Sequence, residues 1–341
     1  MIFDKCRGSI LGLACGDALG VPVETMSARE IKERYGYIKE LRPSPSDHRF
    51  PEVRNLLAGT TSDDTQLARA IMQAVINCDG NFDMEAIVEE HILEYSRSYG
   101  RGWGGSTSKS CRRLQGGVHW SKSAEPNGGG NGVLMKIAPL GLMHALTEES
   151  TALLIARAMQ LGEMTHGDPA AVTAGVVHAV MIKELAGKEF QRKTKGDVLN
   201  EVSPLITETA AYVEKNLPDT TKKISAMWSL VFERLHRVAA GASLGEIACL
   251  FRTDTNNAFY SVDSFGLSYF LFIRNPFSFD AVFDAVNVGG DTDTNAAVVG
   301  SLVGALNGAS VIPRHVLAGL EARDELEAQI TKFIKKVLSR N

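Results

Sequence analysis

Paired cysteines, long apolar runs and an excess of one charge are all missing from this chain of 341 residues. Its five cysteines are scattered and form no C-x-x-C pair, which favours reduced thiols in a cytoplasmic protein over a disulfide framework. No segment approaches the roughly 18 uninterrupted apolar residues of a membrane-spanning helix. The formal net charge of −4 offers no basic footprint for nucleic acid. We therefore expect a cytoplasmic protein that binds neither membrane nor nucleic acid.

Strand-like alternation of apolar and polar residues is also missing, whereas helical periodicity recurs along the chain. Apolar residues repeat at helical spacing in residues 63–77, 84–99, 169–187, 225–241, 278–288 and 295–308. A charged segment from Arg314 to Arg340 follows Pro313 and is predicted to form one or two further helices. Because the motifs described below lie near both ends and must meet, we predict one all-α domain spanning residues 1–341. Residues 191–256 are expected to form peripheral helices.

Signatures of two common nucleotide-binding folds are absent as well. The chain has neither a G-x-x-x-x-G-K-[ST] loop nor a Rossmann fingerprint after a strand, which argues against kinases and dehydrogenases. It has instead two glycine-rich stretches between helices, RGWGGSTS from Arg101 and EPNGGGNGV from Glu125. Such stretches serve as loose connectors, or they allow the backbone to approach a ligand closely.

Glycine recurs at every fourth residue in two predicted helices. The first stripe is Gly8, Gly12, Gly16 and Gly20, and the second is Gly300, Gly304 and Gly308. Each glycine inside a helix costs up to ~1 kcal/mol relative to alanine, and a spacing of four places them on one face, where another helix can approach closely. We infer that the two stripes pack together in antiparallel orientation. The end of the first helix, with Asp17 and Glu24, would then lie near the start of the second.

Pairs of aspartates precede two of the predicted helices. SDDT places Asp63 and Asp64 before one helix, and DTDT places Asp291 and Asp293 before another. One aspartate per helix would be explained by N-terminal capping alone. Four carboxylates brought together would repel one another unless a cation neutralised them, and oxygen ligands without His or Cys favour Mg²⁺ or Mn²⁺ over zinc. We therefore favour a site for two divalent cations, with capping as the alternative.

The paired aspartates belong to a series of five motifs that extends from about Gly8 to Gly308. The motifs are GSILGLACGDALGVPVE, TSDDTQLARAI, GNGVLMKIAPLGL, THGDPAAVTAG and AVNVGGDTDTNAAVVGSLVGAL. Their order and spacing resemble those of the ADP-ribosylglycohydrolase family. The resemblance implies an all-helical fold around a binuclear magnesium or manganese centre, with the ligands Ser62, Asp63, Asp64, Asp291, Asp293 and Thr294. Ser62 stands where the family usually has threonine, and it keeps the hydroxyl ligand.

The resemblance also implies a substrate pocket. The loop that holds the diphosphate and the distal ribose in the family corresponds to Gly129, Gly130, Asn131 and Gly132. His166 matches a histidine near the nucleotide pocket, although a single histidine beside a helix start can equally be a hydrogen-bonded structural residue. Gly104, in the first glycine-rich stretch, completes the predicted substrate-binding set.

The activity that the resemblance implies is hydrolysis of the glycosidic bond between ADP-ribose and a modified acceptor. The cations would hold the ribose hydroxyls and a water, and the carboxylate of Glu24 or Asp63 would orient or deprotonate that water. Asp293 completes the predicted catalytic set. The substrate would be an ADP-ribosylated protein or a small ADP-ribosyl compound, with arginine favoured over serine or polymeric ADP-ribose as the acceptor. The protein is expected to be a monomer.

Two other functions stay open on the residues alone. A binuclear magnesium hydrolase that acts on other nucleotides or on phosphate esters would use the same paired aspartates. A family member without catalytic activity would persist as an ADP-ribose-binding or structural protein. The presence of all four aspartates, with Glu24 and Thr294, argues against such a loss of catalysis.

Overall fold

Helices carry almost all of the regular structure, which confirms the predicted all-α fold. The computed structural model describes residues 1–98, 102–147, 149–188, 194–217, 221–237, 242–251, 253 and 259–340. Within these ranges, strand pairing is limited to three isolated bridges. The site described below is therefore built from helix ends and the loops between them.

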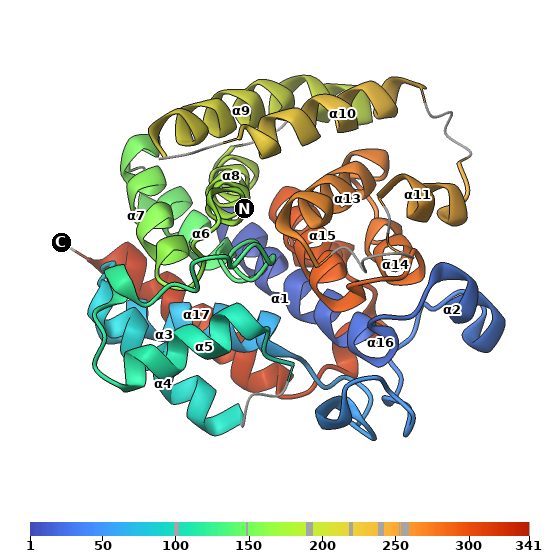
Figure 1. Ribbon diagram of the computed structural model, residues 1–341, viewed down its shortest axis with the longest axis horizontal. Helices are drawn as coiled ribbons and strands as arrows, with labels where there is room; N and C mark the ends of the chain where they lie inside the picture. Colours follow the sequence, from blue (N-terminus) through green and yellow to red (C-terminus); the bar gives the residue numbers. More distant parts are fainter. Residues whose placement is uncertain are drawn as a thin grey trace.

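The helices are labelled in Figure 1. The first half of the chain forms α1 (Ile2–Gly20), α2 (Ala28–Tyr35), α3 (Asp63–Asn77), α4 (Met84–Ser98), α5 (Gly105–Gln115), α6 (Ala138–Thr147), α7 (Thr151–Glu163) and α8 (Pro169–Gly187). The second half forms α9 (Lys195–Asn216), α10 (Lys223–Arg237), α11 (Leu244–Phe251), α13 (Ser261–Arg274), α14 (Asp280–Asn287), α15 (Thr292–Asn307), α16 (Arg314–Ala318) and α17 (Arg323–Ser339). Short 3₁₀ helices lie at Val21–Val23, Pro51–Val53, Trp120–Lys122 and Ala309–Val311.

Helix starts agree best with the sequence where capping residues mark them. α3 begins at Asp63 and α8 at Pro169, both as predicted. α15 begins at Thr292, three residues before the predicted start, because apolar periodicity does not register its polar first turn. The predicted helix ends at residue 99 and at residues 238–241, and parts of the predicted stretch 191–256, lie outside the described residues.

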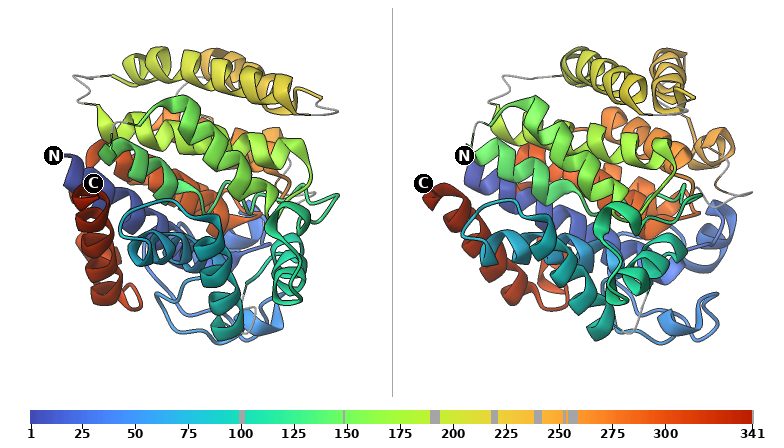
Figure 2. Two further views of the ribbon diagram at one scale, coloured as in Figure 1. Left: turned by 90° about the vertical axis from the view of Figure 1, so that its left-hand side faces the viewer. Right: turned by 60° about the vertical axis from the view of Figure 1, so that its left-hand side comes forward.

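α1 and α15 form the centre of the molecule (Figures 1 and 2), and they share the most extensive contact between any two described helices. α8 and α13 pack against α15, α3 and α17 pack against α1, and α6 contacts both α8 and α1. α9 and α10 form an outer layer, at the top of both figures, that rests on α8 and α13. One aspartate pair therefore lies at the start of the central helix α15, and the other at the start of α3, which packs against α1.

Glycine lets the backbones of α1 and α15 touch. A Cβ atom added at Gly304 would lie 2.0 Å from the carbonyl oxygen of Gly8. At the other end of the pair, a Cβ atom on Gly20 would lie 2.3 Å from the amide nitrogen of Asp293. Distances this short leave no room for a side chain, which explains the glycines despite the ~1 kcal/mol cost of each one in a helix. The antiparallel packing inferred from the two stripes is confirmed.

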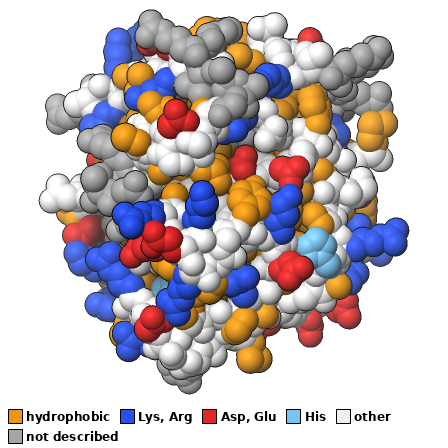
Figure 3. Space-filling model, turned by 90° about the vertical axis from the view of Figure 1, so that its right-hand side faces the viewer, with side chains coloured by type: hydrophobic (Ala, Val, Ile, Leu, Met, Phe, Trp, Pro, Cys, Tyr) orange, Lys and Arg blue, Asp and Glu red, His pale blue; other side chains and the backbone are white. Residues whose placement is uncertain are grey.

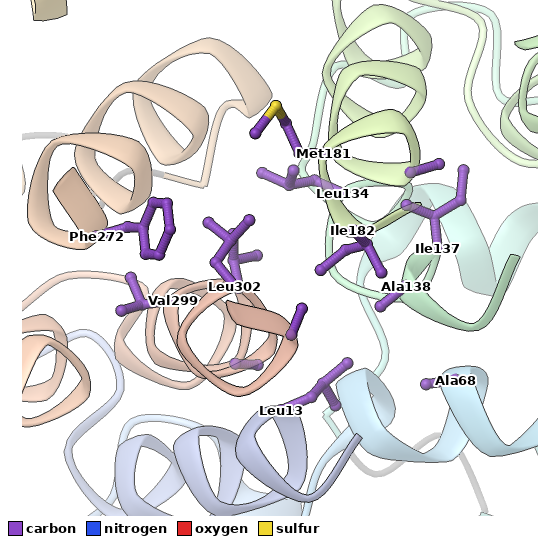
Figure 4. Close-up of a cluster of buried hydrophobic side chains, with 14 of the residues drawn as sticks. Leu13, Ala68, Leu134, Ile137, Ala138, Met181, Ile182, Phe272, Val299 and Leu302 are labelled. Carbon is purple, nitrogen blue, oxygen red and sulfur yellow. The ribbon is translucent and has the colours of Figure 1, made fainter. Parts of the chain in front are cut away.

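A continuous apolar core surrounds this helix pair. Figure 4 shows Leu13 of α1, Leu302 of α15 and Met181 of α8 converging, with Phe272 of α13 beside Val299. All five side chains are fully buried. Among the described helices only α8 is long and apolar enough to cross a membrane, and 83% of its most apolar window is buried inside the protein, as in a core helix.

Charged side chains of both signs are interspersed over the face shown in Figure 3, with hydrophobic side chains between them. This distribution agrees with the small net charge of −4. All five cysteines, each within the described residues, are free thiols, as expected. Burial raises the pKa of Cys6 and Cys15 to about 12, which keeps both thiols protonated and unreactive.

Stability is expected to fall in acid through His178, which is fully buried in α8. Its Nδ1 lies 3.2 Å from the hydroxyl of Tyr269, its Nε2 lies 3.0 Å from Oγ of Ser301, and burial lowers its pKa from 6.5 to about 3. Between these pH values the unfolded chain binds a proton that the folded chain does not. The free energy of unfolding therefore decreases by up to ~1.4 kcal/mol per pH unit as the pH falls through this window.

Urea unfolding at several pH values would measure this effect. The variant His178→Gln is expected to show a flatter pH dependence than the wild type, whereas His119→Gln, at an exposed histidine, keeps the wild-type dependence. Equal pH dependence in His178→Gln and the wild type would contradict the assignment. The variant is compared with the wild type because buried carboxyl groups elsewhere change the free energy of unfolding with pH in the opposite direction. Their contribution is the same in both proteins and cancels.

Candidate active site

The start of α3 is capped by a carboxylate from another helix. Asp17 of α1 is fully buried; its Oδ1 accepts the backbone N–H of Ser62 at 2.9 Å, and its Oδ2 accepts that of Thr65 at 3.1 Å. The Thr65 hydroxyl donates to the same Oδ2 at 2.5 Å. Because Asp17 satisfies N–H groups at this helix end, Asp63 and Asp64 are not needed as caps.

The N-cap aspartate of α15 is also free for another purpose. Asp291 occupies the N-cap position of α15, but its side chain makes no capping hydrogen bond to the described backbone. Its Oδ2 instead accepts the side-chain amide of Asn131 at 2.6 Å. Capping alone therefore explains neither aspartate pair.

Hydrogen bonds link the two aspartate pairs. Oδ2 of Asp64 accepts the hydroxyl of Ser62 at 3.2 Å and that of Thr294 at 3.3 Å, which joins the start of α3 to the start of α15. Oδ2 of Asp63 accepts the backbone N–H of Gly104 at 3.4 Å. The segments that the sequence placed about 230 residues apart thus form one polar cluster.

Burial and mutual repulsion raise the pKa of the clustered carboxyl groups. Oxygen atoms of Glu24, Asp291 and Asp293 lie within 4.8 Å of one another, and all three residues are buried. Burial is the largest cause of the raised pKa of Glu24, followed by repulsion from Asp293 and Asp291. The pKa of Asp63 is raised in the same way, and that of Asp17 is raised to about 7. A bound cation would offset this repulsion and stabilise the charged form of the cluster.

Two carboxylate oxygens of the cluster, Oδ1 of Asp64 and Oδ1 of Asp293, are buried without a hydrogen-bond partner among the described residues. Buried polar atoms are normally paired, so these two oxygens call for a partner. The surrounding donors are carboxylate and hydroxyl oxygens, the ligands that hard divalent cations prefer. The residues present therefore fit a divalent metal ion. Glu24, which the sequence indicated as a catalytic residue, lies in this acidic cluster with Asp291 and Asp293.

A cavity of about 330 Å³ opens beside the cluster. Of the predicted catalytic and metal-binding residues, it is lined by Glu24, Asp63, Asp291, Asp293 and Thr294. Of the predicted substrate-binding residues, it is lined by Gly104, Gly130, Asn131, Gly132 and His166. The carboxylates and the glycine loop therefore share one cavity, of the size that small-molecule ligands occupy.

Three predicted site residues lie behind the wall of this cavity. Ser62 and Asp64 are buried beneath it, 3% and 1% exposed. A Cβ atom on Gly129 would lie 2.9 Å from the ring of Tyr260 and 3.0 Å from Asp168, and its carbonyl accepts the backbone N–H of Ser261 at 2.9 Å. Gly129 is therefore placed to anchor the loop, while Gly130 to Gly132 face the cavity.

Three residues that line the cavity lie outside every motif and glycine-rich stretch that the sequence singled out: Phe50, Glu52 and Phe259. Phe50 and Glu52 flank the start of the short 3₁₀ helix Pro51–Val53, in an irregular segment between α2 and α3. Neither periodicity nor motif spacing singles out such a segment. The only signal is an aromatic and an acidic residue on either side of a proline, which is too common to be specific.

The first glycine-rich stretch and the residues just before it are described in part. Tyr99 and Arg101 lie outside the described residues. Trp103 lines the cavity and donates its Nε1–H to Oε1 of Gln66 at 2.9 Å. Glu125, the acid of the neighbouring loop, does not line this cavity as described, because its carboxylate pairs with Lys109 at 3.2 Å and Arg113 at 2.7 Å.

The fold has a counterpart among solved structures. A structure described as an ADP-ribosylglycohydrolase-related protein complex matches with a TM-score of 0.70 at 23% sequence identity, covering 98% of this chain and 99% of that chain. At this identity the match shows the all-helical fold that the two proteins share.

Sequence relatives extend over the whole chain. An uncharacterized protein of Archaeoglobus fulgidus is 29% identical over 335 residues, covering 97% of this chain and 96% of the relative. The ADP-ribosyl-[dinitrogen reductase] glycohydrolase of Rhodospirillum rubrum is 25% identical over 340 residues, covering 96% of this chain and 93% of the relative. The profile of the ADP-ribosylglycohydrolase family matches residues 1–340. The chain belongs to the ADP-ribosylglycohydrolase family, and the predicted enzyme class is confirmed.

Proposed function

We propose that this chain hydrolyses the glycosidic bond between ADP-ribose and a protein acceptor, as a monomeric cytoplasmic enzyme that uses two divalent cations, Mg²⁺ or Mn²⁺. One observation carries the proposal: four buried acidic side chains line one cavity, and capping of their helices does not explain them. The Rhodospirillum rubrum relative acts, by its name, on ADP-ribosyl-dinitrogen reductase, which supports a protein acceptor.

In this reaction the bond between ribose C1″ and the acceptor breaks, and a bond between C1″ and a water oxygen forms. One water proton passes to a carboxylate, and the departing acceptor gains a proton. Glu24 and Asp63 suit the first task, because both line the cavity and burial raises their pKa values, which makes each carboxylate a stronger base than an exposed one. Divalent cations held by the aspartates would neutralise charge and polarise the water and the ribose hydroxyls.

The glycine loop suits the diphosphate of the substrate. Gly130 and Gly132 line the cavity without side chains, so their backbone can approach an anion closely. Asn131 donates to Asp291 and thereby holds the loop against the acidic cluster. This arrangement would bind ADP-ribose with its distal ribose toward the carboxylates.

Arginine is the acceptor that the mouth of the cavity favours. Phe50 offers an aromatic face and Glu52 an exposed carboxylate, and both line the cavity. A guanidinium group can stack on an aromatic ring and pair with a carboxylate, whereas a serine hydroxyl gains little from either.

The acceptor preference can be tested with Glu52→Gln. We expect KM for an ADP-ribosyl-arginine peptide to rise about 3- to 5-fold, the size expected for an exposed ion pair, with little change for a serine-linked peptide. Steady-state kinetics would measure the change of KM on each of the two peptides. Glu40→Gln, at an exposed glutamate that does not line the cavity, serves as the control. Equal effects on the two substrates would contradict the arginine assignment.

The proposed activity itself is tested by a product assay. Purified protein would be incubated with arginine-linked and serine-linked ADP-ribosyl peptides and with a phosphodiester substrate, and free ADP-ribose would be measured. Release is expected to stop with a chelator and to return with added Mg²⁺ or Mn²⁺. Binding of ADP-ribose in calorimetry without any release would identify a binding protein, and hydrolysis of the phosphodiester alone would identify a different hydrolase.

A further inference from the structure

A lysine is sealed inside the protein next to the cavity. Lys136 is 0% exposed and lies in the segment between the glycine loop and α6. Its Nζ donates a hydrogen bond to Oγ1 of Thr165 at 3.2 Å. Burial lowers the pKa of Lys136 to about 8, so the ammonium group stays protonated at neutral pH. A buried ammonium is costly to maintain, which implies a role for its hydrogen bond.

The Thr165 hydroxyl joins Lys136 to His166. Oγ1 of Thr165 lies 2.8 Å from Nδ1 of His166. An ammonium group can only donate, so Thr165 must accept from Lys136, and its own single hydrogen then points to another acceptor. Within the described residues, Nδ1 of His166 is the other group that forms a hydrogen bond with this hydroxyl. Nδ1 therefore accepts.

An accepting Nδ1 determines which ring nitrogen carries the proton. Burial lowers the pKa of His166 to about 3, so the ring is neutral near pH 7 and has one N–H. That N–H must be on Nε2.

The Nε2 side of the ring faces the glycine loop of the cavity. His166 lines the cavity, although it is only 2% exposed. A Cβ atom on Gly132 would lie 3.1 Å from Nε2, and one on Gly130 would lie 3.9 Å from it. A donor at this position can reach an oxygen atom of a ligand held by Gly130 to Gly132.

We propose that Lys136 and Thr165 are positioning residues that hold His166 in its Nε2–H tautomer, so that it donates a hydrogen bond to an oxygen of the bound substrate. The tautomer is determined by the hydrogen bonds of Thr165 in the free protein. The identity of the substrate oxygen, on a phosphate or a ribose hydroxyl, rests on the proposed function. In this arrangement His166 binds and orients the substrate and does not accept a proton from it.

Other groups near Lys136 are compatible with this assignment. Nδ1 of His91 lies 2.8 Å from the carbonyl oxygen of Ile87 and must donate to it, which leaves Nε2 as an acceptor. Burial raises the pKa of Cys111 to about 11, so that it stays a neutral thiol. Lys136 is therefore the cationic group that orients the Thr165 hydroxyl.

The tautomer can be read directly by nuclear magnetic resonance. Long-range ¹H–¹⁵N spectra of the ¹⁵N-labelled free protein distinguish a protonated from an unprotonated ring nitrogen, and His166→Asn identifies the signals. We expect Nε2 protonated and Nδ1 unprotonated in the wild type. The opposite pattern would mean that His166 donates to Thr165, and it would overturn the proposal.

Paired variants test the two positioning residues. Thr165→Val removes the hydroxyl and is expected to abolish the preference of His166 for the Nε2–H tautomer. Thr165→Ser keeps the hydroxyl and is expected to keep this preference. Lys136→Met is expected to weaken the tautomer preference, and Lys136→Arg to keep it. Thr173→Val is the control, because it removes a buried hydroxyl that bonds to the carbonyl of Pro169 and does not line the cavity. An unchanged His166 pattern in a folded Thr165→Val protein would contradict the proposal.

A binding measurement separates this inference from the proposed function. With ADP-ribose as the probe, calorimetry is expected to show about tenfold weaker binding for Thr165→Val, and near wild-type binding for Thr165→Ser and Thr173→Val. In turnover, KM should rise more than kcat falls. If wild-type protein neither binds ADP-ribose nor releases it, the proposed function fails while the tautomer result stands. If wild type binds ADP-ribose and Thr165→Val binds it equally well, the positioning role fails.

Discussion

Replacing Asp293 with asparagine is expected to reduce the release of ADP-ribose by roughly 10²- to 10⁴-fold while the fold stays intact. Asp293 lines the cavity, its Oδ1 is buried without a partner among the described residues, and it is a cause of the raised pKa of Glu24. Asparagine keeps the shape but removes the charge that would hold a cation. Rates on an ADP-ribosyl peptide with saturating Mg²⁺ or Mn²⁺ would measure the loss.

The same variant should abolish the stabilisation of the protein by divalent cations. Without divalent ions, Asp293→Asn is expected to melt at a higher temperature than the wild type, because it relieves repulsion among buried carboxylates. With Mg²⁺ or Mn²⁺, the wild type should gain stability and the variant should not. Asp79→Asn, at an exposed aspartate paired with Lys336, is the matched control. An active Asp293→Asn protein with a wild-type response to cations would contradict the proposed metal site.

The second large effect is expected in the folding of Gly304→Leu. The Cβ atom alone would lie 2.0 Å from the carbonyl oxygen of Gly8, and backbone cannot move aside as a side chain can. Overpacked cores typically lose 1–3 kcal/mol, and this contact of two backbones should cost at least about 3 kcal/mol. Chemical unfolding would measure the free energy of unfolding. Cation binding should weaken with it, because α15 carries Asp293 and α1, through Asp17, holds the start of α3 that carries Asp63 and Asp64.

Gly245→Leu supplies the control for this substitution. Gly245 also lies in a helix, α11, but it is exposed, and the nearest atom to its Cβ position is Oγ of Ser243 at 4.0 Å. Its replacement should change the free energy of unfolding by less than about 1 kcal/mol. Similar destabilisation in the two variants would show that the close approach of α1 and α15 does not account for the stripe.

Helices were predictable because their signals are local. The periodicity of α3 and α8 and the capping residues before them lie within a few residues of each helix start, so sequence and structure agree at Asp63 and Pro169. The packing of α1 on α15 was also predictable, since glycines at helical spacing leave one helix face without side chains, and a second helix can then approach that face closely. Where the first turn is polar, as at Thr292, the same reasoning placed the start too late.

The acidic part of the candidate site could be inferred for a different reason. Paired aspartates beside hydroxyl residues are rare enough at two helix starts to indicate a cation site, and the motif series supplied the family. The roles of other residues depend on partners far away in the chain. Asp17 accepts the backbone N–H of Ser62, the N-cap residue of α3, which lies 45 residues later in the chain. The cavity positions of Phe50 and Glu52 depend on how an irregular segment folds.

Composition, periodicity and motif order thus specify an all-helical member of the ADP-ribosylglycohydrolase family with its acidic residues, because each of these signals is carried by neighbouring residues. Tertiary structure decided which of those residues share a cavity, which lie behind its wall, and which are not needed to cap a helix. It also brought Lys136, Thr165 and His166 into one hydrogen-bonded chain. Such contacts depend on directions and distances across the folded protein, and a linear pattern of residue types does not encode them.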